Sequence, residues 1–144
     1  DCAKCIPDEE KVKLCKDNNI EITDMEMKNQ FLFHSKAGAV LARNKYGIND
    51  DDVLSAITFH TTGKPNMTLL EKIIFSADYI EPSRNQAPNL DYLRKIAYSD
   101  IDLTVYTILR DTLNYLKSKG NSTDNIDVNT CKAYEFYKNV IENR

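Results

Sequence analysis

Three side chains with metal-binding chemistry lie at apolar helical faces of this sequence. His34 and His60 are its only histidines, and Asp78 lies at the edge of an apolar stripe. Burying an imidazole or a carboxylate costs free energy unless a cation or a hydrogen-bond partner meets it. Nitrogen and oxygen ligands of these types suit iron, manganese and zinc. The three residues therefore form a candidate metal site on the inward faces of successive helices.

Each of these residues also has a purely structural interpretation. A single histidine on an apolar face is more often a hydrogen-bonded core residue than a metal ligand. Asp78 could pair with Lys72 or cap a neighbouring segment, since buried aspartates are usually paired or metal-bound. The combination of the three residues, rather than any one of them, favours the metal.

A polar loop directly after His60 is a candidate phosphate site. Its hydroxyls can donate hydrogen bonds, and Lys64 can act as a point charge beside a phosphate. It is not a P-loop, because the upstream glycine and the preceding strand are missing, so Lys64 could equally be a solvated lysine after a helix end. Arg84 could bind a phosphate with two parallel hydrogen bonds or be an ordinary surface arginine. The loop consists of Thr61, Thr62, Gly63 and Lys64.

Composition places these residues in a single helical domain. The 144 residues are 42% hydrophobic and 28% charged, with 4 glycines, 4 prolines and no tryptophan, which favours helices over a turn-rich β fold. A formal charge of −3 argues against a nucleic-acid-binding surface. No apolar run is long enough to span a membrane and no signal-peptide pattern is visible, so the expected compartment is the cytoplasm. Cys2 and Cys5 lack the second pair that a zinc ribbon needs, which favours reduced thiols.

Apolar spacing and capping residues predict an all-α bundle with no strands. Thr23 and Glu26 have the spacing of a capping box, Asn49 or Asp50 should cap the helix that carries His60, and Gly47 should end the helix that carries His34. Residues 82–90 and 121–127 are expected to be loops. Helices are expected at about 8–18, 25–33, 34–46, 50–62, 68–80, 89–98, 100–120 and 130–143, with Gly63 ending the helix that carries His60.

The sequence resembles the symmetrical diadenosine tetraphosphate hydrolases of the HD-domain superfamily, the YqeK type. This resemblance extends over essentially the whole chain, and it is most specific around His60 and Asp78. The segments that carry it are Asp1-Cys2-Ala3-Lys4, FHSKAGAVLA with His34, Gly47-Ile48, Asp52-Val53-Leu54, Ala56-Ile57, His60-Thr61-Thr62-Gly63-Lys64-Pro65, Met67, Ala77-Asp78-Tyr79-Ile80-Glu81-Pro82, Arg84, Leu93-Arg94 and Ala97.

The resemblance implies a ligand set for two metal ions. Asp1 matches the aspartate of the family's His-Asp doublet, with Lys4 at the usual spacing after it. His34 and His60 match two further histidines, and Asp78 matches the late aspartate. An early histidine and the histidine of the doublet have no counterpart here. We expect them in a segment before Asp1, so that residues 1–144 form a single HD domain that lacks its N-terminal helical part.

The resemblance also implies the reaction. Two close metal ions, iron first and manganese or another ion as the alternative, would serve symmetrical hydrolysis of diadenosine tetraphosphate to two ADP. Lys4, Thr61, Thr62, Lys64 and Arg84 would contact the nucleotide or its phosphates. Two alternatives remain open: another HD-domain phosphohydrolase acting on a different nucleotide, and a non-catalytic helical module that only binds a nucleotide. The oligomeric state, base preference and metal identity are left open.

Overall fold

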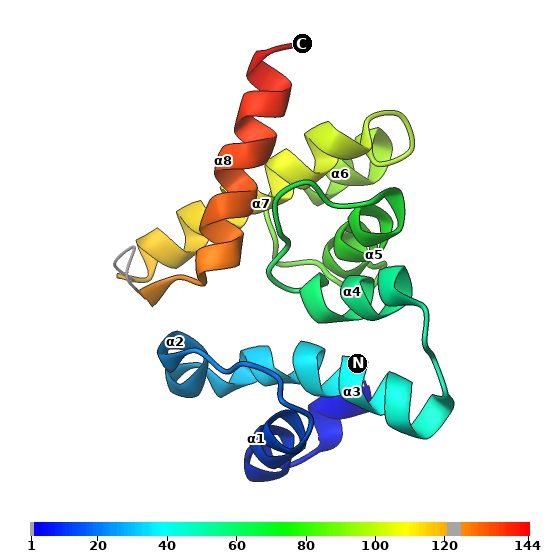
Figure 1. Cartoon of the computed structure of the whole chain (residues 1–144). Coiled ribbons are helices and arrows are strands. Elements are labelled where there is room, and N and C mark those ends of the chain that lie inside the picture. Colours follow the sequence, from blue (N-terminus) through cyan, green and yellow to red (C-terminus); the bar gives the residue numbers. More distant parts are fainter. Residues whose placement is uncertain (1, 121–124) are drawn as a thin grey trace.

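The computed structural model describes residues 2–120 and 125–144, and it contains only helices within these ranges (Figure 1). The predicted all-α bundle is therefore confirmed. The elements are η1 (Cys2–Cys5), α1 (Asp8–Asp17), α2 (Asp24–Lys28), η2 (Gln30–Leu32), α3 (Phe33–Tyr46), α4 (Asp51–Phe59), α5 (Leu69–Ile80), α6 (Leu90–Ile96), α7 (Ile101–Ser118) and α8 (Val128–Glu142), where η marks a 3-10 helix.

Local capping sets several helix ends where the sequence predicted them. Thr23 and Glu26 form the expected capping box at α2. Asp50 caps α4 by accepting hydrogen bonds from the backbone N–H groups of residues 52 and 53. Gly47 ends α3 with a φ of 67°, a left-handed conformation that glycine adopts without a steric penalty.

The segment before His34 differs from the single helix expected over residues 25–33. The α2 helix ends at Lys28, because Asn29 leaves the helical conformation with a ψ of 74°, and η2 follows before α3 begins at Phe33. The first residues also form η1, which the sequence did not predict. These breaks place His34 in the first turn of its helix, at one end of α3.

The helices form two groups that meet along α3 and α4. Figure 1 shows α1, α2 and α3 on one side of the molecule and α5 to α8 on the other, with α4 packed against both α3 and α5. The main core lies among α5, α6, α7 and α8, and Tyr137 and Leu109 are almost completely buried in it. A smaller core joins η1, α1 and α3 around Ala3, Cys15 and Ala37. The boundary between the two groups carries the candidate site.

No helix in the described part of the chain is long and apolar enough to cross a membrane.

Candidate metal and nucleotide site

The two histidines meet at the boundary between α3 and α4. His34 lies in the first turn of α3, and His60 is the residue that ends α4. Both side chains are buried, and His34 Nε2 lies 3.1 Å from His60 Nε2. Of the three residues expected to converge on one site, His34, His60 and Asp78, the structure thus brings the two histidines into contact.

Both imidazole rings are held in the same tautomer by the backbone behind them. His34 Nδ1 lies 2.6 Å from the Phe31 carbonyl oxygen, and His60 Nδ1 lies 2.6 Å from the Ile57 carbonyl oxygen. A carbonyl oxygen only accepts, so each Nδ1 carries the proton, and each neutral ring turns the lone pair of Nε2 toward the other ring. Two lone pairs facing each other suit a cation that both nitrogens can bind.

Electrostatics favour the neutral, ligating form of His34. Burial lowers its pKa, and the neighbouring His60 and Lys4 lower it further, although the Phe31 carbonyl works in the opposite direction. An imidazole that stays neutral at physiological pH keeps its Nε2 lone pair available. Thr61 Oγ1 lies 3.3 Å from the same nitrogen, so the loop after α4 also touches this point.

The distance between the two nitrogens fits one shared ion. Two nitrogens bonded at about 2.0–2.1 Å in neighbouring positions around an ion lie about 3 Å apart, and the observed separation is 3.1 Å. Within the described residues, however, no group of three or more histidine, cysteine, aspartate or glutamate side chains is close enough to hold a metal ion. Asp1, the first residue of the expected ligand set, lies outside the described residues.

Asp78 lines the same pocket as His34 but does not form a cluster with the two histidines. Its side chain is 34% exposed, and its Oδ2 lies 3.8 Å from Nη2 of Arg84. The neighbouring Ile73 and Ile74 are 46% and 38% exposed, so the apolar stripe that suggested a core-facing Asp78 is partly on the surface. Lys72 pairs with Asp102 at 2.9 Å, which leaves Arg84 as the cation beside Asp78.

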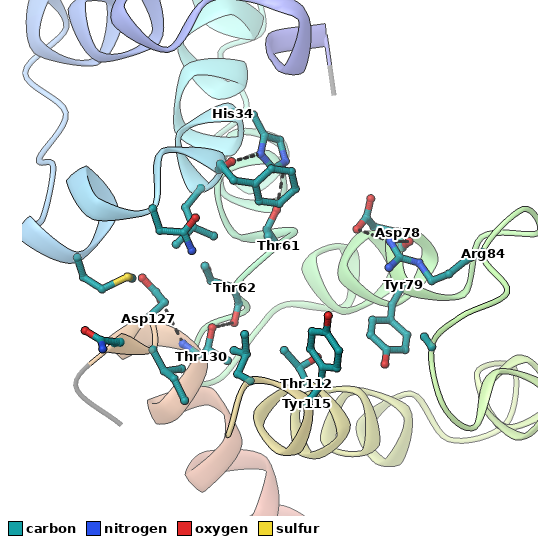
Figure 2. Close-up of a pocket in the computed structure, with 18 of the residues that line it drawn as sticks. His34, Thr61, Thr62, Asp78, Tyr79, Arg84, Thr112, Tyr115, Asp127 and Thr130 are labelled. Atoms are coloured by element: carbon teal, nitrogen blue, oxygen red, sulfur yellow. Dashed lines mark hydrogen bonds and ion pairs between the residues drawn. The ribbon is translucent and has the colours of Figure 1, made fainter. Parts of the chain in front are cut away.

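The pocket is a cavity of about 780 Å³ between the two groups of helices. Figure 2 shows His34 and Thr61 above it, Asp78, Arg84 and Tyr79 on one side, and Asp127, Thr130 and Thr62 on the other. Residues from α2, η2 and α3 thus face residues from α5, α7 and α8. Such a volume is in the range of small-molecule sites, which are usually apolar clefts with a few placed polar groups.

Arg84 is the best-placed cation of this pocket for an anionic ligand. Its Nη2 donates to the Asp78 carbonyl oxygen at 3.2 Å, and its guanidinium lies over the Tyr79 ring, 5.4 Å from the ring centroid. Its Nε is buried without a hydrogen-bond partner among the described residues. A buried donor without an acceptor is costly, and a phosphate oxygen would be a suitable acceptor for this atom. Lys4 also lines the pocket.

Lys64 lies elsewhere, away from the residues that line the pocket. Its Nζ makes an ion pair with Glu71 at 2.8 Å and approaches Ser55 Oγ at 3.2 Å. Glu71 is 1% exposed and accepts from the Thr68 backbone N–H at the start of α5. The structure therefore brings Thr61, Thr62, Lys4 and Arg84 to the pocket, but it gives Lys64 an interaction that ties the loop to α5.

Two pocket residues were missed from the sequence. Asp127 caps α8 through the backbone N–H groups of residues 129 and 130, and Thr130 Oγ1 donates to the Thr62 carbonyl oxygen at 3.0 Å. The sequence predicts a polar loop over residues 121–127. The only signal was an aspartate before an apolar helical pattern, which predicts a cap but not its position beside Thr62.

Comparisons with known proteins agree with this fold. The family model described as HD domain matches residues 1–83. A crystal structure from Clostridium acetobutylicum, described as a predicted HD superfamily hydrolase involved in NAD metabolism, superposes with a TM-score of 0.89 at 41% identity, covering 97% of this chain and 72% of that one. This chain belongs to the HD domain family.

Named relatives confirm the resemblance drawn from the sequence. Proteins named symmetrical bis(5'-nucleosyl)-tetraphosphatase are 49% identical over 89 residues in Halalkalibacterium halodurans, covering 62% of this chain and 47% of the relative. The Bacillus subtilis relative is 42% identical over 92 residues, which cover 64% of this chain and 49% of the relative. The Staphylococcus aureus relative is 39% identical over 107 residues, which cover 73% of this chain and 55% of the relative. The chain thus spans about half the length of these relatives.

Proposed function

We propose that this protein is a metal-dependent hydrolase that splits diadenosine tetraphosphate at its central phosphoanhydride bond and releases two ADP. The observation that carries the proposal is the pair of anchored histidines, whose Nε2 atoms lie 3.1 Å apart, with His34 lining a large pocket. The names of the relatives support the same reaction. HD-domain hydrolases depend on metal ions, which agrees with the donor set found here.

The proposed metal ligands are Asp1, His34, His60 and Asp78. Two ions, iron first and manganese as the alternative, would supply an activated water and would neutralise charge on the attacked phosphate. The chain's own contribution is to fix both imidazoles in the ligating tautomer through the carbonyl oxygens of Phe31 and Ile57. This anchoring means that little reorganisation is needed when an ion binds.

The proposed substrate contacts come from both sides of the pocket. Arg84 has a buried Nε without a partner among the described residues, and it would donate to a phosphate beside the attacked phosphorus. Lys4, Thr61 and Thr62 line the same cavity and would offer an ammonium group and two hydroxyls. Flanking phosphates held in this way supply binding energy that positions the central bond. Lys64 is paired with Glu71, so we assign it an indirect role through the loop.

We also propose that residues 1–144 belong to one HD domain, although the family model ends at residue 83. The pocket is the reason, because Thr112 and Tyr115 of α7 and Thr130 of α8 line it together with His34. Cutting the chain after residue 83 would remove one wall of the cavity. The proposed partner is a small dinucleoside polyphosphate, without nucleic acid or membrane.

The test is product analysis with the full-length protein loaded with Fe²⁺ or Mn²⁺. Diadenosine tetraphosphate should yield ADP alone when the reaction is followed by anion-exchange chromatography. ATP plus AMP would place the attack at the wrong phosphorus and overturn the proposal. Faster release of inorganic phosphate from nucleoside monophosphates would instead favour a general HD-domain phosphohydrolase.

A further inference from the structure

The pocket has an end that the phosphate chemistry does not use. Figure 2 shows Asp127 and Thr130 across the cavity from Asp78 and Arg84. We call this end the Asp127 end. The cavity is also lined by the apolar side chains of Met25, Leu116 and Ile126, and Ile126 directly precedes Asp127 in the chain. Lys28, Asn29 and Asn125 line the cavity as well, but a buried carboxylate itself disfavours a phosphate, which needs donors and positive charge.

Asp127 is buried and uses only part of its hydrogen-bonding capacity. Asp127 is only 7% exposed. Its Oδ1 accepts from the backbone N–H of Asn129 at 2.8 Å and from that of Thr130 at 3.3 Å. Its Oδ2 makes no hydrogen bond within the described part of the chain, and the residue lines the cavity. A carboxylate oxygen in this position is an acceptor that a bound ligand can use.

Charge decides which part of the substrate can approach this acceptor. An ionised carboxylate repels a phosphate, so the polyphosphate must lie toward Arg84 and Lys4 rather than here. A nucleoside, in contrast, is neutral and carries N–H and O–H donors. A flat base between Met25, Leu116 and Ile126 would also bury its ring faces against apolar side chains, including the polarisable methionine.

The number of available oxygens narrows the choice of base. Guanine presents two adjacent donors that a carboxylate pairs with by using both of its oxygens, and Oδ1 of Asp127 is already occupied by the cap of α8. Adenine presents one exocyclic amino group, which needs a single acceptor. We propose that Asp127 accepts a hydrogen bond through Oδ2 from the exocyclic amino group of an adenine base bound at the Asp127 end. The assignment rests on the proposed function, because it takes the adenine to be one end of the dinucleotide.

A hydrogen bond connects the Asp127 end to the loop that follows His60. Thr130 Oγ1 donates to the Thr62 carbonyl oxygen at 3.0 Å, and Thr62 lies two residues after His60. The first turn of α8 therefore carries Asp127 and also supports the loop that follows α4. A base seated against Asp127 would be placed at a fixed position relative to the metal ligands, as positioning of a reacting phosphate requires.

The test compares two ligands that differ only in the amino group. Binding of ADP and of purine riboside 5'-diphosphate, which lacks that group, is measured by calorimetry on the full-length metal-loaded protein. Two variants are used, Asp127→Asn and Asp127→Ser. Both asparagine and serine cap helices well, so α8 should stay folded, while neither offers the second carboxylate oxygen. Asp50→Asn is the matched control, because Asp50 also caps a helix with two backbone N–H groups but lies outside the pocket.

We expect the unaltered protein to bind ADP about tenfold more tightly than the amino-free nucleotide, which is the usual effect of one hydrogen bond to a charged group. Both Asp127 variants should bind the two ligands equally, and Asp50→Asn should keep the tenfold preference. An equal loss for both ligands in the Asp127 variants would overturn the assignment and leave only a structural role. A loss that instead follows the ribose hydroxyls, with 2'-deoxy-ADP or 3'-deoxy-ADP as probes, would also overturn it.

The outcome is separable from that of the proposed reaction. If diadenosine tetraphosphate is split to ADP but Asp127→Asn keeps the preference for the amino group, the adenine contact is wrong and the hydrolase stands. If the protein binds ADP with the expected pattern but does not split the tetraphosphate, the contact stands and the reaction is wrong.

Discussion

Lys64 Nζ lies 2.8 Å from Glu71 Oε1, and this ion pair engages Lys64 outside the set of residues that line the pocket. Arg84 has a different position, since it lines the pocket and has a buried Nε without a partner among the described residues. The two basic residues follow successive ligand-bearing helices in the sequence, yet the structure separates their roles. Substitution of Arg84 should therefore affect substrate binding, whereas substitution of Lys64 should affect the stability of the fold.

Arg84→Ala should raise the KM for diadenosine tetraphosphate about ten- to a hundredfold, because a charge-assisted contact to phosphate is lost. Lys64→Ala should leave KM within about threefold, since Lys64 makes its contacts with Glu71 and Ser55. Steady-state kinetics and metal analysis on the full-length protein measure both effects. A raised KM in Lys64→Ala at normal thermal stability would contradict this division.

Glu71 should make stability depend on pH. Burial raises the pKa of this carboxyl, but its hydrogen bonds with Lys64, Ser55 and Thr68 outweigh burial and lower the pKa below its ordinary value. A folded-state pKa below the unfolded value contributes stability above the unfolded pKa, and that contribution is lost as the pH falls through the folded pKa. Glu71→Gln should therefore lower the free energy of unfolding by about 1–3 kcal/mol at pH 7 and by much less below pH 4.

Urea unfolding of both proteins across this pH range measures the difference. Glu135→Gln, at an exposed position of α8, serves as the control and should show no such trend. A difference between Glu71→Gln and the unaltered protein that stays constant from pH 7 to pH 3 would show that the ionised form of Glu71 is not what stabilises the fold.

His60→Ala should lower both metal content and activity. The imidazole of His34 would lose its neighbour at 3.1 Å, and the proposed ligand set would fall from four side chains to three, which weakens metal binding. Removing a residue that hydrogen-bonds to a metal ligand typically lowers metal affinity or activity 10–100-fold. Removing the ligand itself should therefore lower kcat/KM by at least about a hundredfold. Elemental analysis reports the metal, and Tyr98→Ala, at a side chain that is 95% exposed, is the control. Full metal content in His60→Ala would contradict the metal assignment.

Thr130→Val should destabilise the fold while Thr130→Ser should not. Valine has the shape of threonine but no hydroxyl, so the buried Thr62 carbonyl oxygen loses its donor at 3.0 Å. An unpaired buried acceptor costs about 1–3 kcal/mol, whereas serine restores the hydroxyl. In thermal unfolding, the melting temperature of Thr130→Val should lie several degrees below that of the unaltered protein. The melting temperature of Thr130→Ser should be close to that of the unaltered protein. Equal melting temperatures for the three proteins would mean that the bond contributes nothing.

The sequence by itself determined most of the helices, because periodicity and caps are local properties. The capping box of Thr23 and Glu26 and the cap at Asp50 needed only side chains within three residues of the backbone groups that they bind. The break at Asn29 was not predictable in the same way, because a helix of five residues is stabilised mainly by the packing of its surroundings. The candidate histidines were likewise visible as two polar residues on apolar faces.

Only the tertiary structure decided which of the polar residues meet. The approach of His34 and His60 depends on how α3 and α4 cross, and their common tautomer depends on the carbonyl oxygens of Phe31 and Ile57. Lys64 could reach either a ligand or an acidic side chain, and the path of the loop into α5 gave it Glu71. Asp127 is 67 positions after His60 in the numbering. Its place at the pocket follows from the packing of α8 against α7, which no local pattern encodes.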